Sequence, residues 1–240
     1  EDILAKTDRI ASHVWPYSRL ACYHLSALVL HPPRETAVQC TICYCRDDRF
    51  TSDVLDFFAD FKVPNVTWDW YPLEKERLCR RAIGRNEIAK NNQSDFVFYS
   101  DIDYVLRGEV IDAAVREIGD ENALFYPRDV LQSKTHQDGD AEIWRVTEPG
   151  IYEIEDSRYD IIPLDRPIGG CQWLRGDFLR EKGYLPDGHK FLAPEPEWRR
   201  TYEDCRSRGY WCLPWKRLAV NGVRRIRHSD RGRDTVGLVL

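Results

Sequence analysis

The sequence contains no methionine, not even at position 1, so we expect the natural start to lie further upstream. It also lacks any apolar run near the roughly 18 residues that a membrane-spanning helix needs. The first ten residues, EDILAKTDRI, are polar, so we expect no signal peptide within them. The composition therefore predicts a chain without a transmembrane segment.

An excess of positive charge is absent too. The 40 Asp and Glu residues outnumber the 35 Lys and Arg residues, and the formal net charge is -5. General nucleic-acid binding depends on clustered positive charge, so the composition argues against that function. With 240 residues, 42% of them hydrophobic, the chain can bury the core of one globular domain.

The eight cysteines lack the spacing of a zinc site. Cys40, Cys43 and Cys45 lie in the run CTICYC, but no second close pair exists to complete four ligands. Buried free cysteine behaves as a small apolar residue, so we expect reduced structural thiols. Reduced thiols are typical of the cytoplasm, whereas a defined set of disulfides would indicate an oxidising compartment.

Strand and helix patterns alternate along the first half of the sequence. Short β-rich runs are each followed by apolar residues at helical spacing, and Thr51 or Ser52 is the expected cap of the second helix. The expected strands are 10–15, 37–45, 65–71 and 96–100, and the expected helices are 18–30, one from residue 51, 75–90 and 109–118. Four such repeats predict an α/β fold with a mostly parallel, twisted sheet and helices on both faces.

The second half is less regular. Residues 132–168 contain many charges and only short β-like runs such as IYEIE at 151–155, which predicts an irregular segment over the sheet edge. Residues 169–185 begin with two glycines and lead into a short helix. A further helix is expected over 196–210, and a final strand after Trp215.

Acidic residues follow several of the expected strands: Asp47, Asp48, Asp69, Asp101 and Asp103. The carboxyl ends of parallel strands meet at one edge, where such sheets bind ligands. In an extended segment Asp101 and Asp103 would point the same way, so both carboxylates could bind one magnesium or manganese ion. The plain alternative for this pair is a turn.

One polar side chain interrupts an apolar helix face before that acidic pair. Asn86 shares its face with Ile83 and Ala89 and lies next to Arg85. A polar group in such a place needs a hydrogen-bond partner. The partner is either a bound ligand at the sheet edge or a neighbouring loop.

The run GRNEIAKNNQSDFVFYSDID, at residues 84–103, resembles the helix, spacer, strand and D-x-D motif of GT-A glycosyltransferases. The closest resemblance is to the family-2-like enzymes that use nucleotide sugars. CRDD after the second strand precedes this run, and the glycine pair, the late ED pair and a final histidine come after it, in the same order as in that family. Two regions depart from the pattern: VWPYSR replaces the usual P-x-Y/F-N run, and residues 132–168 have no counterpart.

The resemblance implies one GT-A domain, with a Rossmann-like sheet and an irregular C-terminal acceptor side. Residues 1–120 would form the nucleotide-sugar-binding half and residues 121–240 the acceptor-binding and catalytic half. The implied activity is metal-dependent transfer of a sugar from a nucleotide sugar, with UDP favoured, to an acceptor hydroxyl. Manganese or magnesium would be the cofactor. Inversion is expected, with retention as an open alternative.

The resemblance also implies roles for individual residues. Asp204 would be the general base, with Glu203 as the alternative, and the metal would be held by Asp101, Asp103 and His228. The donor would be bound by Trp15, Tyr17, Asp47, Asp48, Arg85, Asn86, Asp101, Gly169, Gly170, Arg231 and Arg233. The two arginines belong to a C-terminal basic run for which a diphosphate would be an anionic partner.

Two other functions fit part of the pattern. A nucleotidyltransferase can share this layout, but it usually has a glycine-rich loop after the first strand, and VWPYSRL contains no glycine. A non-catalytic carbohydrate-binding protein would explain the 8 Trp and 12 Tyr residues, which stack well on sugars. It would leave the acids at the strand ends without a role.

Overall fold

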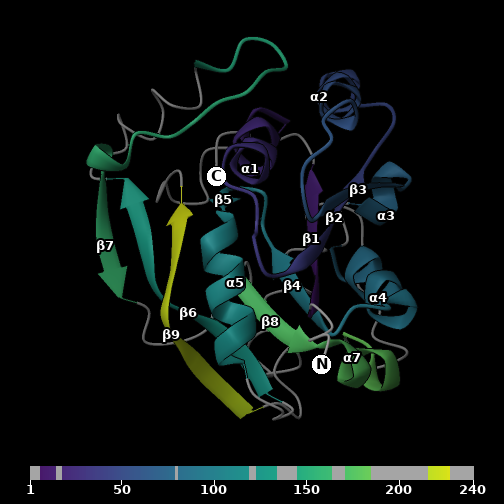
Figure 1. Cartoon of the computed structure of the whole chain (residues 1–240). Coiled ribbons are helices and arrows are strands. Elements are labelled where there is room, and N and C mark those ends of the chain that lie inside the picture. The colour runs from purple at the N-terminus through teal and green to yellow at the C-terminus, as the bar shows by residue number, and fades with distance from the viewer. Residues whose placement is uncertain are drawn as a thin grey trace.

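The computed structural model describes residues 6–14, 18–78, 81–118, 123–133, 145–163, 171–184 and 216–227 (Figure 1). Within these ranges no helix combines the length and the apolar character that crossing a membrane requires.

The first half of the chain alternates strands and helices, as its sequence predicts. Its elements are β1 (Thr7–Val14), α1 (Ser18–Leu30), β2 (Ala37–Tyr44), α2 (Arg49–Ala59), β3 (Val66–Pro72), α3 (Lys75–Leu78), α4 (Arg81–Asn91), β4 (Phe96–Ser100), β5 (Tyr104–Val105) and α5 (Gly108–Glu117). Strand β1 pairs in parallel with both β2 and β4, and β2 pairs in parallel with β3. The predicted parallel α/β sheet is therefore confirmed. Within the range 75–90 predicted as one helix, the structure describes α3 and α4, and residues 79–80 between them lie outside the described residues.

The second half contains more β-structure than its sequence predicts. Its elements are β6 (Ala123–Ser133), the 3-10 turn η1 (Asp156–Arg158), β7 (Tyr159–Pro163), β8 (Cys171–Arg175), α7 (Gly176–Lys182) and β9 (Lys216–Arg227). The strand-like run at 151–155 does not form a strand. The next strand in the sequence is β7, which begins at Tyr159. The expected helix over 196–210 lies outside the described residues.

All nine described strands belong to one sheet. Its order is β3-β2-β1-β4-β8-β6-β9-β5, and β7 pairs with β6 beside this path. Strand β8 is antiparallel to both β4 and β6, whereas β9 is parallel to β6 and antiparallel to β5. Figure 1 shows β6, β7 and β9 extending to one side of the parallel strands. Strands from both halves of the chain thus build the same sheet.

Each face of the sheet packs against its own set of helices, because side chains alternate along a strand. On β4, Phe96 and Phe98 face the core formed with α1, α2 and α5. Val97 and Tyr99 face the second core, which includes residues of α4 and α7. Trp173 of β8 stacks on Phe98, with ring centroids 3.8 Å apart. Burying one such aromatic side chain contributes roughly 1.5–3 kcal/mol.

A carboxyl group is buried at the start of the central strand. Asp8 of β1 is 0% exposed, and its Oδ2 accepts a hydrogen bond from Trp173 Nε1 at 3.1 Å. Its Oδ1 has no hydrogen-bond partner among the described residues. Desolvation raises the pKa of this carboxyl to about 7, although the Trp173 hydrogen bond acts in the opposite direction. Asp8 is therefore a source of pH-dependent stability.

We expect the Asp8 carboxyl to make folding less favourable as the pH rises from about 4 to 7. In the unfolded chain the Asp8 carboxyl titrates near 3.8, so within this window the folded state binds one more proton. Each unit of pKa difference corresponds to about 1.4 kcal/mol, so the loss amounts to a few kcal/mol and stays constant at higher pH. Asp8→Asn removes this titration. Denaturant unfolding at pH 5 and pH 8 measures the effect, and parallel profiles for both proteins would contradict it.

Candidate functional site

The order of the parallel strands reverses at β1. From β1 the chain builds outward through β2 to β3, then returns to place β4 on the other side of β1. In open α/β sheets, ligands bind in the crevice outside the carboxyl ends of the strands at such a reversal. The residues that follow β1, β2 and β4 are therefore the candidate site.

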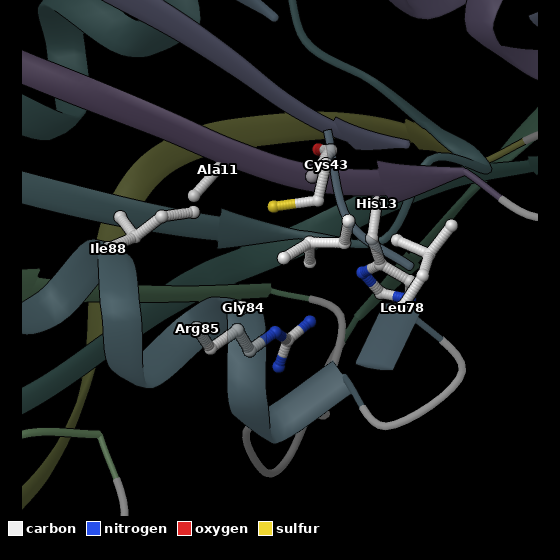
Figure 2. A pocket seen from close by; sticks show the side chains of 9 residues that line it. Ala11, His13, Cys43, Leu78, Gly84, Arg85 and Ile88 are labelled. Carbon is white, nitrogen blue, oxygen red and sulfur yellow. The ribbon is translucent and has the colours of Figure 1, made fainter. Parts of the chain in front are cut away.

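A small hollow lies beside this edge, between the sheet and the helices α3 and α4. In Figure 2 the thiol of Cys43 and the imidazole of His13 come from the strands, whereas Arg85 comes from α4. A Cβ atom on Gly84 would lie 3.3 Å from Cys43 Sγ and 3.3 Å from a Leu73 methyl group. The absence of a side chain at Gly84 therefore keeps the hollow open. Its lining is Ala11, Ser12, His13, Cys43, Leu73, Leu78, Gly84, Arg85 and Ile88.

The D-x-D motif forms a turn, so the expectation of an extended segment is wrong. Strand β4 ends at Ser100, and the Tyr104 N–H donates to the Asp101 carbonyl at 3.1 Å. Between the two acids, Ile102 is 3% exposed and belongs to the core with α1 and α5. Both acids remain half-buried. The buried isoleucine, rather than strand alternation, fixes the turn to the core.

Asp101 forms an ion pair with a buried arginine. Arg85 Nη2 donates to Asp101 Oδ1 at 3.0 Å, and the two side chains are 5% and 26% exposed. A guanidinium keeps its charge even when buried, so it needs a compensating anion. The structure thus brings together two of the residues predicted to contact the donor.

Two tyrosines enclose the same guanidinium. The Arg85 guanidinium carbon lies 5.5 Å from the ring centroid of Tyr99 and 5.4 Å from that of Tyr184. Arg85 Nη1 donates to the Tyr184 hydroxyl at 2.8 Å, and the Tyr99 hydroxyl donates to the Arg85 carbonyl at 3.0 Å. Desolvation raises the pKa of Tyr99 well above its ordinary value, so this hydroxyl stays protonated. Neither tyrosine was predicted from the sequence, although Tyr99 is a polar residue within the expected buried strand FVFYS.

Asn86 finds its partner in a loop. Its Oδ1 accepts a hydrogen bond from the backbone N–H of Tyr184 at 2.8 Å. Of the two partners that the sequence allowed for Asn86, a bound ligand or a neighbouring loop, the structure shows the loop. Its contact with a donor stays a prediction.

A histidine that looks like part of an apolar helix stripe supports the D-x-D turn. His24 of α1 is 1% exposed, and its Nδ1 donates to the Tyr104 carbonyl at 2.6 Å. The carbonyl can only accept, so Nδ1 holds the proton and Nε2 can accept from the Ser12 hydroxyl at 3.3 Å. His24 therefore connects β1 to the residue directly after Asp103.

The acids after β2 differ in their surroundings. Asp47 is exposed, whereas Asp48 caps α2: its carboxylate accepts from Thr51 N at 3.2 Å and Thr51 Oγ1 at 2.6 Å. The expected cap at Thr51 or Ser52 is thus wrong, since the helix begins two residues earlier. Both oxygens of the Asp48 carboxylate thus accept hydrogen bonds from the first turn of α2. A contact of Asp47 or Asp48 with a nucleotide stays a prediction.

We expect Asp48→Ala to lower the free energy of unfolding by about 1 kcal/mol, the usual effect of losing an N-cap. Asp48→Asn keeps an oxygen acceptor and should recover most of that stability. Chemical denaturation of the three proteins measures the difference. Equal stability of Asp48→Ala and the unmodified chain would show that the cap contributes nothing.

Asp69 does not lie at the strand edge where its position in the sequence suggested. It lies within β3 opposite Thr41 of β2. Arg9 Nη2 donates to Asp69 Oδ2 at 2.7 Å, and the Thr41 hydroxyl donates to the same oxygen at 2.9 Å. Arg9 Nε also donates to Thr41 Oγ1 at 2.8 Å. This acid joins three strands instead of facing the crevice.

The four cysteines whose side chains are described are free and buried: Cys22, Cys40, Cys43 and Cys45. Desolvation raises the pKa of the Cys22 and Cys43 thiols to about 12 and that of Cys40 further. Such thiols stay protonated and unreactive near neutral pH. For these four residues the structure agrees with the predicted structural role.

The remaining predicted site residues lie outside the described ranges. They are Trp15, Tyr17, Gly169, Gly170, Glu203, Asp204, His228, Arg231 and Arg233. Among the described residues, no group of three or more His, Cys, Asp or Glu side chains is placed to bind a metal ion. Of the three predicted metal ligands, the described residues include Asp101 and Asp103, which lie at the carboxyl end of β4.

Solved structures share this arrangement of elements. A mannosyltransferase from Pyrobaculum calidifontis, in complex with GDP-Man and Mn2+, has a TM-score of 0.52 and 13% identity over 94% of this chain. GalNAc-T7, with UDP, GalNAc and Mn2+, has a TM-score of 0.56 and 12% identity over 95% of this chain. The chain has the GT-A fold.

The GT-A fold agrees with the resemblance noted from the sequence. At these identities the likeness establishes the fold alone. The chain spans 58% of the length of the mannosyltransferase and 44% of that of GalNAc-T7. No protein-family model and no curated protein sequence matches it.

Proposed function

We propose that the chain is a glycosyltransferase that takes its sugar from a nucleotide sugar in the presence of a divalent cation. The observation that supports this most is the Arg85–Asp101 ion pair, with Asp103 two residues on, at the carboxyl end of β4. It lies at the strand reversal of a GT-A sheet, where a ligand is expected. Arg85 also lines the hollow between β1, β2 and α4.

The ligands of the neighbouring structures support the substrate class. One neighbour holds GDP-Man and Mn2+, and the other holds UDP, GalNAc and Mn2+. Both contain a nucleotide and manganese, although the nucleotides differ. We propose UDP as the favoured nucleotide for this chain because of the motifs in its sequence, and GDP is the natural comparison.

We propose that the acidic pair binds a manganese or magnesium ion. Asp101 and Asp103 offer carboxylate oxygens, which hard cations prefer, and such ions complete their shell with water and substrate phosphates. His228 is the proposed third ligand. The cation would supply charge that stabilises the diphosphate as it leaves. Arg85 would hold the Asp101 carboxylate in place, because the two form an ion pair.

The acceptor hydroxyl must lose a proton as the new bond forms. A carboxylate within hydrogen-bond reach would act as the base. We propose Asp204 for this role, with Glu203 as the alternative and inversion of the anomeric centre as the outcome. The ED pair at residues 203–204, which matches the motif of the resembling family, supports this assignment.

We expect UDP to bind at least about tenfold more weakly in a chelator than in manganese, because the paired acids repel the phosphates when no cation is bound. Asp103→Asn should weaken binding in manganese and, because it removes one of the repelling charges, strengthen it in the chelator. Calorimetry with UDP and GDP measures both effects.

The matched control for this titration is Asp53→Asn, which removes an exposed carboxylate from α2. It should bind as the unmodified chain does. Equal UDP affinity in manganese and in chelator would rule out the metal-dependent site. Pyrophosphate release from UTP and a sugar phosphate would instead identify a nucleotidyltransferase.

We expect Asp204→Asn to bind the donor normally and to transfer sugar roughly 10² to 10⁴ times more slowly, since a positioned base contributes about that factor. Donor binding and transfer are measured separately, with Glu203→Gln beside it. A fast Asp204→Asn enzyme together with an inactive Glu203→Gln enzyme would reverse the two roles. Full activity of both would leave neither acid as the base.

A further inference from the structure

Arg85 has side-chain contacts in addition to its ion pair with Asp101. The residue is 4% exposed, so its guanidinium has lost nearly all of its contact with water. One edge donates to Asp101 Oδ1 at 3.0 Å, and another N–H donates to the Tyr184 hydroxyl at 2.8 Å. A guanidinium that donates in two directions has little rotational freedom.

The Tyr184 hydroxyl is itself held in one orientation. It donates to Gln172 Oε1 at 2.8 Å, so the oxygen presents its lone pairs to Arg85. Gln172 and Tyr184 are each 3% exposed. Gln172 lies on β8 opposite Tyr99 of β4, which places it beside the strand that ends in the D-x-D turn. The chain Gln172–Tyr184–Arg85–Asp101 thus runs from β8 to the candidate site.

The backbone at Tyr184 is fixed as well. The residue follows α7 directly after Gly183, whose φ of 71° lies in the left-handed region that glycine adopts readily. The Tyr184 N–H donates to Asn86 Oδ1 at 2.8 Å, which ties the loop to α4 one residue after Arg85. Its ring also packs against Tyr99, with centroids 4.7 Å apart. The hydroxyl therefore has a defined place relative to Arg85.

We propose that Tyr184 is a positioning residue for the donor site: its hydroxyl, oriented by Gln172, fixes the Arg85 guanidinium against Asp101. The proposal depends on the function proposed above, because it assigns Arg85 and Asp101 to the nucleotide-sugar site. Tyr184 itself does not contact the substrate in this role. Removing its hydroxyl leaves the ring in place but frees one side of the guanidinium.

The test compares nucleotide affinity in manganese for Tyr184→Phe, Arg85→Lys and the double variant. Loss of a hydrogen bond to a charged group should weaken UDP binding about tenfold in Tyr184→Phe. In the Arg85→Lys background the same change should alter affinity less than about twofold, because the group that Tyr184 positions is gone. Losses that multiply in the double variant would show that Tyr184 acts independently of Arg85, and would overturn the proposal.

A matched control removes a different hydroxyl that contacts α4. Tyr71 donates to Glu87 Oε2 at 2.8 Å, and Tyr71→Phe should keep the affinity within about twofold of the unmodified chain. If Tyr184→Phe fails to fold, Gln172→Leu serves instead, since it removes the acceptor that orients the hydroxyl. Unchanged affinity in a folded Tyr184→Phe or Gln172→Leu protein would also overturn the proposal.

A second measurement separates this proposal from the proposed function. The guanidinium resonances of Arg85, assigned with Arg85→Lys, report its mobility without any nucleotide. They should be sharp in the unmodified chain and in Tyr71→Phe, and averaged in Tyr184→Phe. If the unmodified chain binds neither UDP nor GDP, the proposed function fails. Identical Arg85 resonances in Tyr184→Phe would refute the positioning role whatever the nucleotide result.

Discussion

A buried guanidinium must be compensated by its surroundings, and this requirement organises the region around Arg85. In place of water, the guanidinium contacts one carboxylate, one tyrosine hydroxyl and the faces of two aromatic rings. Arg85 lies on α4, and its partners come from β4, the turn after β4 and the loop after α7. Losing any one of them would leave a buried charge less well compensated, which is costly in a low-dielectric interior.

The two cores place that cluster at the edge of the sheet. Alternation along β4 sends Phe98 to one face and Tyr99 to the other, where it meets Arg85. On the face that Phe98 enters, His24 donates a hydrogen bond to the Tyr104 carbonyl and Ile102 packs in the core, and both contacts support the D-x-D turn. The turn is thus supported from both faces, through a hydrogen bond and apolar packing on one and an ion pair on the other.

Much of the parallel half could be predicted from the sequence, because local patterns determine it. Apolar alternation and helical spacing gave β1 to β4, and α1 and β4 have the predicted bounds. The same patterns misplaced the D-x-D motif, since period-two alternation does not say where a strand ends. Asp69 was misplaced for a related reason: its partner Arg9 lies far away in the sequence. Tyr184 was missed because only the folded chain brings it to Arg85.

The position of β9 has a consequence for the order of folding. This late strand lies between β6 and β5, and Tyr104 of β5 pairs with Arg227 of β9. The short strand that follows the D-x-D turn therefore gains this partner only after β9 has been synthesised. Contacts between residues so distant in sequence form slowly, because the long loop must close first. The parallel half can assemble from neighbouring segments, whereas the turn bearing Asp101 and Asp103 acquires its full support only once β9 has joined the sheet.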